Sequence, residues 1–261
     1  MPPIALITDF GTGDRYVGEM KGAIATVASE VPIIDISHHI APGDLQTAAF
    51  ILDSCYRTFP HGTVFCVVVD PGVGSSRNGI VASAGHYLFV GPDNGVLTWA
   101  LLHEAPAEVR TIDNSDFLRE GEISPTFHGR DVFGPVAAHL AKGTSIIDIG
   151  AETTSFIALP FPQPVVTPAA ITTEIVAIDR FGNVVTTVDN EHLELLAGDT
   201  VVMLCKGSRF TLAIGAFFAS VPKGDALCYI GSAGYLEIGV NGGNASQRFG
   251  LSVGDRIEFL R

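Results

Sequence analysis

The first part of the chain alternates short apolar runs with segments of helical periodicity. Residues 3–8 (PIALIT) and 31–36 (VPIIDI) are apolar runs typical of strands. Between them, residues 14–29 place apolar side chains at the three- and four-residue spacing of a helix. A strand, a helix and a second strand in this order predict a parallel strand pair.

The same alternation continues along residues 1–154, which we expect to form one α/β domain with a mostly parallel, Rossmann-like sheet. In such sheets, ligands bind where strands end on their carboxyl side. Gly143 is expected to close the last helix of this domain. The remaining predicted strands cover 63–70, 79–85 and 86–91, and the remaining predicted helices cover 43–59, 95–104 and 132–143.

The pattern changes after residue 154. Residues 155–170 hold four prolines, which predicts an extended linker. Residues 171–261 then show only short β-type segments separated by Gly, Asn and Asp. This composition predicts an all-β domain, either a small barrel or a sandwich.

Composition restricts the class of protein. Hydrophobic residues make up 47% and charged residues 16%, which indicates a well-filled core or buried subunit interfaces. Apolar runs stay well short of the roughly 18 residues of a membrane span. The N-terminal residues 1–10 lack the basic and apolar regions of a signal peptide. We therefore expect a cytoplasmic protein without a membrane partner.

Charge and cysteine content add two further expectations. The formal net charge is −13 and the sequence shows no basic patch, which argues against a nucleic-acid partner. A negative field favours cationic ligands, although its commoner role is solubility. Cys55, Cys66, Cys205 and Cys228 are widely spaced, as expected of reduced core cysteines.

Carboxylates follow several of the predicted strands. Asp9, Asp70 and Asp179 each come at the end of an apolar run, and a glycine follows each within three residues. One such Asp is often only a turn former or a helix cap. Three in equivalent positions favour a binding site, and glycine lets backbone approach a ligand closely.

The loop after Asp70 resembles a phosphate cradle but lacks its chemistry. Residues 67–77 read VVVDPGVGSSR. A Walker loop needs Lys and then Ser or Thr after its last glycine, and Asp70 would repel a phosphate. We predict instead that the loop orients Asp70 and returns Arg77 toward it. Such a pair could also be purely structural.

Histidines supply one candidate base. His128 lies in a Gly-flanked loop just before a predicted helix, where it could act as a general base or serve as a cap or surface residue. Asp131 is expected to cap that helix. His38 and His39 are adjacent, so they point to opposite faces of a strand, and without an evident third ligand no metal site is expected.

The second domain offers a turn with recognition chemistry. Residues 177–187 (AIDRFGNVVTT) contain Phe181, whose ring could stack, and Asn183, whose amide could pair with a purine edge. The alternative is that FGN is only a β-turn.

Six stretches, in this order, resemble the S-adenosylmethionine (SAM) hydrolases, also called SAM hydroxide adenosyltransferases, which are relatives of fluorinase and chlorinase. The resemblance spans essentially the whole chain. The stretches are ITDFGTGDRYVGEMKGAI, VVDPGVGSSR, GPDNGVLT, FHGRDVFGPVAAHLA, IDRFGN and GYLEIGVNGG.

The resemblance implies a fold, an assembly and a reaction. Family members join an N-terminal α/β domain to a C-terminal β domain and form homotrimers. SAM binds between one subunit's N-terminal domain and its neighbour's C-terminal domain. Water or hydroxide attacks the ribose 5′ carbon, which gives adenosine and methionine without a cofactor. The family's catalytic Asp, Arg and His correspond to Asp70, Arg77 and His128.

The resemblance also implies substrate-binding residues in both domains. It assigns the ribose hydroxyls to Asp9, the methionine ammonium to Asp14 and Asp179, the adenine or ribose faces to Phe181 and Phe218, the adenine edge to Asn183, Asn241 and the Val240 backbone, and the lining of the amino-acid or adenosine end to Ser232 and Glu237.

The halogenase branch departs from this sequence at informative positions. Halogenases carry a phenol where Asp70 stands and a Tyr-Ser pair where His128 and Gly129 stand, so the resemblance favours hydrolysis over halide transfer. Halogenases also hold the methionine carboxylate with an Arg where Ala233 stands, which leaves that role unassigned here. The alternatives are a non-catalytic adenosine- or SAM-binding module and a halide-using adenosyl transferase.

Overall fold

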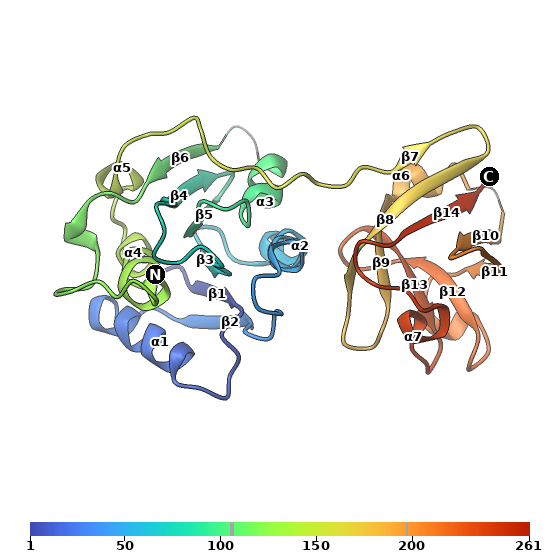
Figure 1. The fold of residues 1–261 in the computed structure, drawn as a ribbon, viewed down its shortest axis with the longest axis horizontal. Coiled ribbons are helices and arrows are strands. Elements are labelled where there is room, and N and C mark those ends of the chain that lie inside the picture. Colours follow the sequence, from blue (N-terminus) through green and yellow to red (C-terminus); the bar gives the residue numbers. More distant parts are fainter. Residues whose placement is uncertain (105–106, 197) are drawn as a thin grey trace. The chain divides into compact units, whose positions relative to one another are not determined.

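The computed structural model describes residues 1–104, 107–196 and 198–261. The chain divides into two compact units, Met1–Pro160 and Phe161–Arg261 (Figure 1). The division falls inside the predicted linker, residues 155–170. The start of that segment lies on the first unit, because Ile157 N–H donates to Asp93 Oδ1 at 2.7 Å and Trp99 Nε1–H donates to the Leu159 carbonyl at 3.0 Å.

The first unit is built on a mixed, mostly parallel sheet with the strand order β2-β1-β3-β5-β4-β6. Strands β1, β2, β3 and β5 run parallel, while β4 is antiparallel to β5 and β6. This confirms the predicted α/β domain. The strands are β1 Ile4–Thr8, β2 Ile33–Ser37, β3 Val64–Val68, β4 Gly79–Ala84, β5 Tyr87–Pro92 and β6 Glu108–Thr111.

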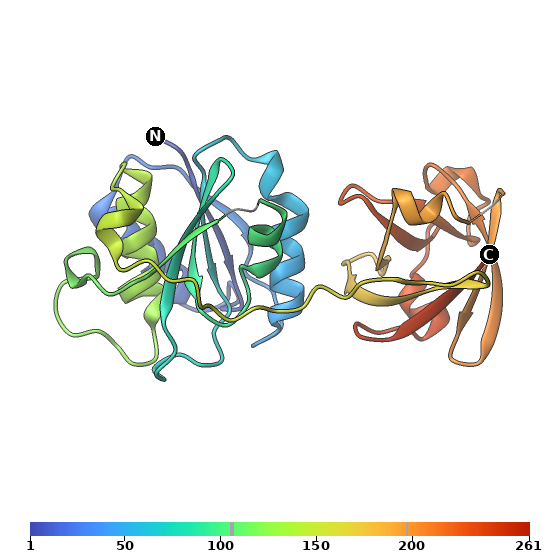
Figure 2. The ribbon, with the colours of Figure 1, turned by 90° about the horizontal axis from the view of Figure 1, so that it is seen from above.

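Helices cover both faces of this sheet (Figure 2). Helices α1 (Tyr16–Val27) and α4 (Gly134–Ala141) pack on one face, and α2 (Leu45–Cys55) and α3 (Thr98–His103) pack on the other. A short helix, α5, spans Ile146–Ile149. Every residue of β1 and β3 is buried, which explains why these strands are continuous apolar runs rather than alternating ones.

The segment before α4 differs from the prediction. Residues Gly129–Phe133 form a π-helical turn that leads directly into α4. Asp131 lies inside this turn and is fully buried, so the expectation that it caps the helix was wrong. Its carboxylate is used by arginine side chains instead. Gly143 does close α4, with a φ of 98° and its N–H on the Leu140 carbonyl.

The second unit is all β, as predicted, and its sheet closes into a barrel. The strand order is β14-β10-β11-β12-β13-β9-β8-β7, and a further pairing of β14 with β8 closes the ring. Strand β7 (Val165–Val166) adds to β8 from the predicted linker. The others are β8 Ala170–Ile178, β9 Val184–Asp189, β10 Thr200–Cys205, β11 Ser208–Ile214, β12 Ala226–Ile230, β13 Tyr235–Val240 and β14 Arg256–Leu260.

Two short helices, α6 (Asn190–Leu193) and α7 (Ala245–Phe249), accompany the barrel. Apolar side chains from the strands and α7 form a core of their own inside this unit. None of the helices in the described ranges combines the length and the apolar character that crossing a bilayer requires.

Candidate active site

Two of the predicted carboxylates follow neighbouring parallel strands of the first unit. Asp9 comes directly after β1, and Asp70 comes two residues after β3, with which β1 pairs in register. The Gly43 N–H donates to Asp9 Oδ2 at 2.9 Å, and a Cβ on Gly43 would lie 3.6 Å from Pro71. The loops that follow β1 and β3 are therefore both close to Gly43 at the carboxyl edge of the sheet.

Asp70, Arg77 and His128 form one polar cluster. Arg77 Nε donates to Asp70 Oδ1 at 3.0 Å, and Arg77 Nη2 donates to Asp70 Oδ2. The same Nη2 lies 2.8 Å from His128 Nδ1. The side chains of Asp70 and Arg77 are only 5% and 11% exposed, so their charges face each other with little water between them. The predicted Asp70–Arg77 pair is thus present, and it includes His128.

The contact with Arg77 sets the hydrogen-bonding state of His128. A guanidinium has only donors, so Nδ1 of His128 must accept. In the neutral ring the proton then lies on Nε2. Burial and the neighbouring Arg77 charge lower the pKa of His128 below 6.5, against the opposing effects of Asp70 and Asp131. The ring is therefore neutral near pH 7.

Glycine is needed where the DPGVG loop passes the segment that precedes His128. Gly74 has a φ of 77°, and a Cβ on it would overlap the carbonyl oxygen of Pro125. The guanidinium of Arg77 lies 5.2 Å from the centre of the Phe133 ring. Close packing on both sides therefore fixes Arg77 relative to His128.

In the second unit, Asp179 organises the FGN turn. Its carboxylate accepts hydrogen bonds from the Phe181 N–H at 2.8 Å, the Asn183 N–H at 2.9 Å and Asn183 Nδ2 at 2.7 Å. The segment is thus a turn, which was the alternative to a recognition role in the sequence analysis. It also presents one group for binding, because Phe181 is 68% exposed while Asn183 is buried.

A second group of predicted residues lies around Gly239 in β13. A Cβ on Gly239 would contact Phe218, Tyr229 and Asn183, so these side chains surround one close-packed point. The Tyr229 hydroxyl donates to Glu237 Oε2 at 2.6 Å, and the Phe218 and Tyr229 ring centres are 5.0 Å apart. Burial raises the pKa of Glu237, and Asp179 raises it further.

Tyr229 was not predicted as a site residue. It lies within the apolar strand β12, and its contact with Glu237 arises from the pairing of β12 with β13.

The remaining predicted residues are at the edges of these groups. Asn241 Nδ2 donates to the Val221 carbonyl at 2.8 Å, and Val240 is buried. Ser232 lies exposed in the turn between β12 and β13, and Asp14 lies exposed just before α1. The structure thus places Asp9, Asp14 and the Asp70 cluster in the first unit and the other predicted residues in the second.

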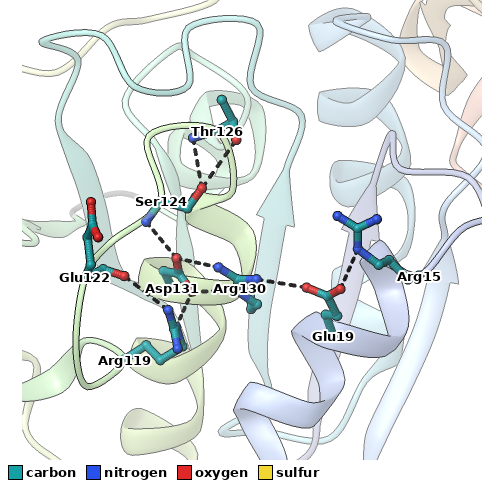
Figure 3. A network of polar contacts seen from close by, with 8 residues as sticks. All are labelled: Arg15, Glu19, Arg119, Glu122, Ser124, Thr126, Arg130 and Asp131. Atoms are coloured by element: carbon teal, nitrogen blue, oxygen red, sulfur yellow. Dashed lines mark hydrogen bonds and ion pairs between the residues drawn. The ribbon is translucent and has the colours of Figure 1, made fainter.

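A row of alternating charges passes through Arg130 and Asp131 of the π-helical turn, which follows His128 in the chain, and this row was not predicted from the sequence (Figure 3). Buried Asp131 accepts from Arg119 Nε, from the Ser124 N–H at 2.8 Å, and from Arg130 Nε and Nη2 at 2.7 and 2.9 Å. Burial raises the pKa of Asp131, but these hydrogen bonds outweigh it and lower the pKa to about 2. Glu19 continues the row on α1. Arg119, Ser124 and Arg130 lie close to Asp131 in the sequence, but Glu19 is 111 residues from Arg130, so the sequence alone did not indicate the row.

His38, the first of the two adjacent histidines, makes a structural contact. His38 is buried, and its Nδ1 lies 2.8 Å from Thr8 Oγ1. Within residues 1–104, 107–196 and 198–261, no three His, Cys, Asp or Glu side chains are grouped closely enough to hold a metal ion.

An α/β unit followed by a β-barrel unit, with an Asp–Arg–His cluster at the carboxyl ends of parallel strands, defines a two-domain α/β protein with a polar site. The SAM hydroxide adenosyltransferase N-terminal domain matches residues 4–150, and the C-terminal domain of the same family matches residues 173–258. The chain therefore belongs to the SAM hydroxide adenosyltransferase family.

Individual relatives are similar to this chain over nearly their full length. The (R)-S-adenosyl-L-methionine hydrolase of Thermus thermophilus is 36% identical, with 100% of both chains covered. A fluorinase of Actinopolyspora mzabensis is 27% identical, covering 100% of this chain and 97% of its own. The crystal structure of an uncharacterized conserved protein from Thermotoga maritima superposes with a TM-score of 0.96 at 39% identity, covering 99% of this chain and 100% of that one.

Proposed function

We propose that this protein hydrolyses S-adenosyl-L-methionine to adenosine and L-methionine. The observation that carries the proposal is the Asp70–Arg77–His128 cluster at the carboxyl edge of the sheet, in which the charged side chains of Asp70 and Arg77 are nearly covered. Family membership and full-length relatives named as SAM hydrolases support it.

The reaction is a substitution at the ribose 5′ carbon. The oxygen of water forms a bond to C5′ while the bond from C5′ to sulfur breaks. The electron pair of that bond passes to sulfur, which becomes the neutral thioether of methionine, and water loses one proton. Because the leaving group is neutral, the difficulty lies in the weak nucleophile, which needs a base and a fixed in-line position.

The cluster offers the required groups. Arg77 and the Nε2–H of neutral His128 are donors that can stabilise a developing hydroxide. Asp70 is a carboxylate with acceptor capacity beyond its two bonds to Arg77, so it can take a hydrogen bond or the proton from water. An anionic nucleophile and a cationic substrate lose charge as they react, which a poorly hydrated site favours.

The binding residues complete the proposal. Asp9 binds the ribose hydroxyls, and Asp14 and Asp179 bind the methionine ammonium. Phe181 and Phe218 pack on the nucleoside, for which the exposed Phe181 ring is suited. The adenine-edge residues are Asn183, Asn241 and the backbone of Val240, and Ser232 and Glu237 line the remainder.

We further propose a homotrimer in the cytoplasm, with each site shared by two subunits and no metal or cofactor required. The family resemblance and the high apolar content support the trimer.

The test is chromatography of SAM incubated with purified protein in oxygen-18 water, with and without chloride. Wild type should release adenosine labelled at the 5′ oxygen, unaffected by EDTA, and Asp70→Ala should not. Asp53→Ala is the matched control, because Asp53 is also a buried carboxylate, paired with His103 at 2.7 Å outside the cluster. A chlorinated nucleoside would support halide transfer, and bound adenosine that is never produced would support a binding module.

A further inference from the structure

A cavity of about 400 Å³ opens beside Asp9 within the first unit. Its walls combine three aromatic rings, one of them a phenol, with two arginines, one carboxylate and two aliphatic hydroxyls. Phe127 makes T-shaped contacts with Phe10 and Tyr16, and Phe10 and Tyr16 are tilted toward each other, at 5.3–6.3 Å between ring centres. The lining residues are Asp9, Phe10, Arg15, Tyr16, Ser124, Thr126, Phe127 and Arg130.

Arg15 is held at this cavity by the row of charges that begins at buried Asp131 (Figure 3). Arg130 is fixed on Asp131, and its Nη1 donates to Glu19 Oε2 at 2.9 Å. Glu19 Oε1 in turn accepts from Arg15 Nε at 2.6 Å. The Arg130 hydrogen bond lowers the pKa of Glu19, so Glu19 stays ionised and keeps its hold on Arg15.

The row carries an unbalanced positive charge at its outer end. Within the part of the chain that the structure describes, the ion pairs of Arg15, Arg119 and Arg130 involve two carboxylates, Glu19 and Asp131. Arg15 is the outermost member, with its side chain 73% exposed. Its bond to Glu19 uses Nε, and Figure 3 shows the two terminal nitrogens pointing away from Glu19. Two parallel N–H donors in that position fit a carboxylate.

We propose that Arg15 binds the α-carboxylate of the amino-acid part of the substrate. This inference rests on the proposed function. Arg15 would then take the carboxylate-binding role that was left unassigned because Ala233 stands where halogenases carry an Arg. The preceding residue, Asp14, is proposed to bind the ammonium, and the ammonium and carboxylate of an amino acid sit on the same carbon. Neighbouring residues at the start of α1 can therefore bind both groups. Glu19 is the positioning residue for Arg15.

The competing explanation is that Arg15 and Glu19 form an ordinary surface ion pair four residues apart on α1, which contributes little to stability or function. The two explanations differ in what the variant should do to substrate selectivity.

The experiment compares SAM with its analogue in which hydrogen replaces the α-carboxylate. In Arg15→Gln, KM for SAM should rise roughly 10- to 100-fold while kcat stays nearly constant, because a contact equal in ground and transition states is lost. The value of kcat/KM for the decarboxylated analogue should not change. Arg15→Lys should restore part of the loss, since a single charge remains.

Arg57→Gln is the matched control. The Arg15 guanidinium lies 5.2 Å from the centre of the Tyr16 ring and pairs with Glu19. The Arg57 guanidinium lies likewise 4.5 Å from the centre of the Tyr56 ring, and it pairs with Glu104 at 3.2 Å. It should leave both substrates unaffected.

Two results would overturn the inference. Equal losses on both substrates in Arg15→Gln would show a structural effect, and full retention of selectivity for SAM would show that another group binds the carboxylate. In either case wild type still hydrolyses SAM. A wild-type protein that hydrolyses neither substrate contradicts the proposed function instead, so the two failures are distinguishable.

Discussion

At the scale of single residues, the charge of Arg77 controls the protonation of His128. Arg77 donates to Nδ1, and its charge, after burial, is a cause of the lowered pKa of that ring. The neutral ring is the form that accepts from Arg77 while keeping a proton on Nε2. Protonation would place two cations side by side and break this hydrogen bond.

The first prediction concerns this titration. In wild type, kcat/KM should fall only as the pH drops through a His128 pKa that lies below 6.5. Replacing Arg77 by Gln removes the cation and leaves Asp70 beside the ring, so the pKa of His128 should rise by roughly one unit or more. NMR titration of the His128 ring signals in wild type and in Arg77→Gln measures both pKa values. An unchanged His128 midpoint would contradict the arrangement.

A second residue, Asp131, gives a prediction on stability. Its pKa is lowered from 3.8 to about 2 in the folded protein. A lowered carboxyl pKa contributes stability that is present above about pH 4 and lost as the pH falls toward 2. Asp131→Asn should therefore reduce the free energy of unfolding at pH 7 by about 2 kcal/mol, and the difference from wild type should shrink near pH 3.

Urea titration followed by Trp99 fluorescence measures this effect. Trp99 is the single tryptophan of the chain and is buried in the first unit, so its signal reports the unit that contains Asp131. Asp148→Asn changes an exposed carboxylate of α5 and should alter the free energy of unfolding neither at pH 7 nor near pH 3. A pH-independent difference between Asp131→Asn and wild type would mean that the lost stability does not come from ionisation.

At the scale of elements, the sequence predicted what periodicity and burial dictate. Strands β1 and β3 are buried throughout and almost entirely apolar because both faces are covered, and the glycines after them marked loops that approach other backbone. The Asp70–Arg77 pair was predicted because the two residues flank such a glycine-containing loop. Strand β6, an EVRT segment at the edge of the sheet, has no apolar run and was not predicted.

Other features depend on tertiary structure alone. The apolar and polar positions of the π-helical turn Gly129–Phe133 also suit an α-helix. The sequence therefore did not separate this turn from α4, and the predicted helix start at residue 132 falls inside the turn. Asp131 looked like a cap because Asp commonly precedes helices. Its actual partners include Arg119, twelve residues earlier, and through Arg130 it reaches Glu19, which only the packing of α1 against this turn brings near.

The third prediction tests the contact between two loops. Gly74→Ala places a Cβ against the Pro125 carbonyl and in a left-handed backbone conformation. The loop that carries Asp70 and Arg77 must then shift relative to His128, and we expect kcat to fall roughly 100-fold. Gly143→Ala imposes the same backbone strain, with a φ of 98°, but its Cβ would meet nothing within 4 Å. That control should lose stability while kcat is retained; equal kcat losses in both variants would contradict the loop contact.

At the scale of the whole molecule, the predicted site residues are divided between two compact units. Asp70, Arg77 and His128 belong to Met1–Pro160, while Phe181 and Asn183 belong to Phe161–Arg261. Each unit has its own hydrophobic core. If each site takes its two parts from different subunits, as proposed, then two inactive chains can supply one intact site between them.

The last prediction uses this division. Asp70→Asn should inactivate the part of the site in the first unit. Phe181→Glu should block the nucleoside face in the second unit without unfolding it, because Phe181 is 68% exposed. Each variant alone should be inactive and should sediment as a trimer. After the two are unfolded and refolded together in equal amounts, about one quarter of the sites should combine two wild-type parts, and about one quarter of wild-type SAM hydrolysis should return. Recovery requires sites shared between subunits, so an inactive mixed trimer would place each site within one chain.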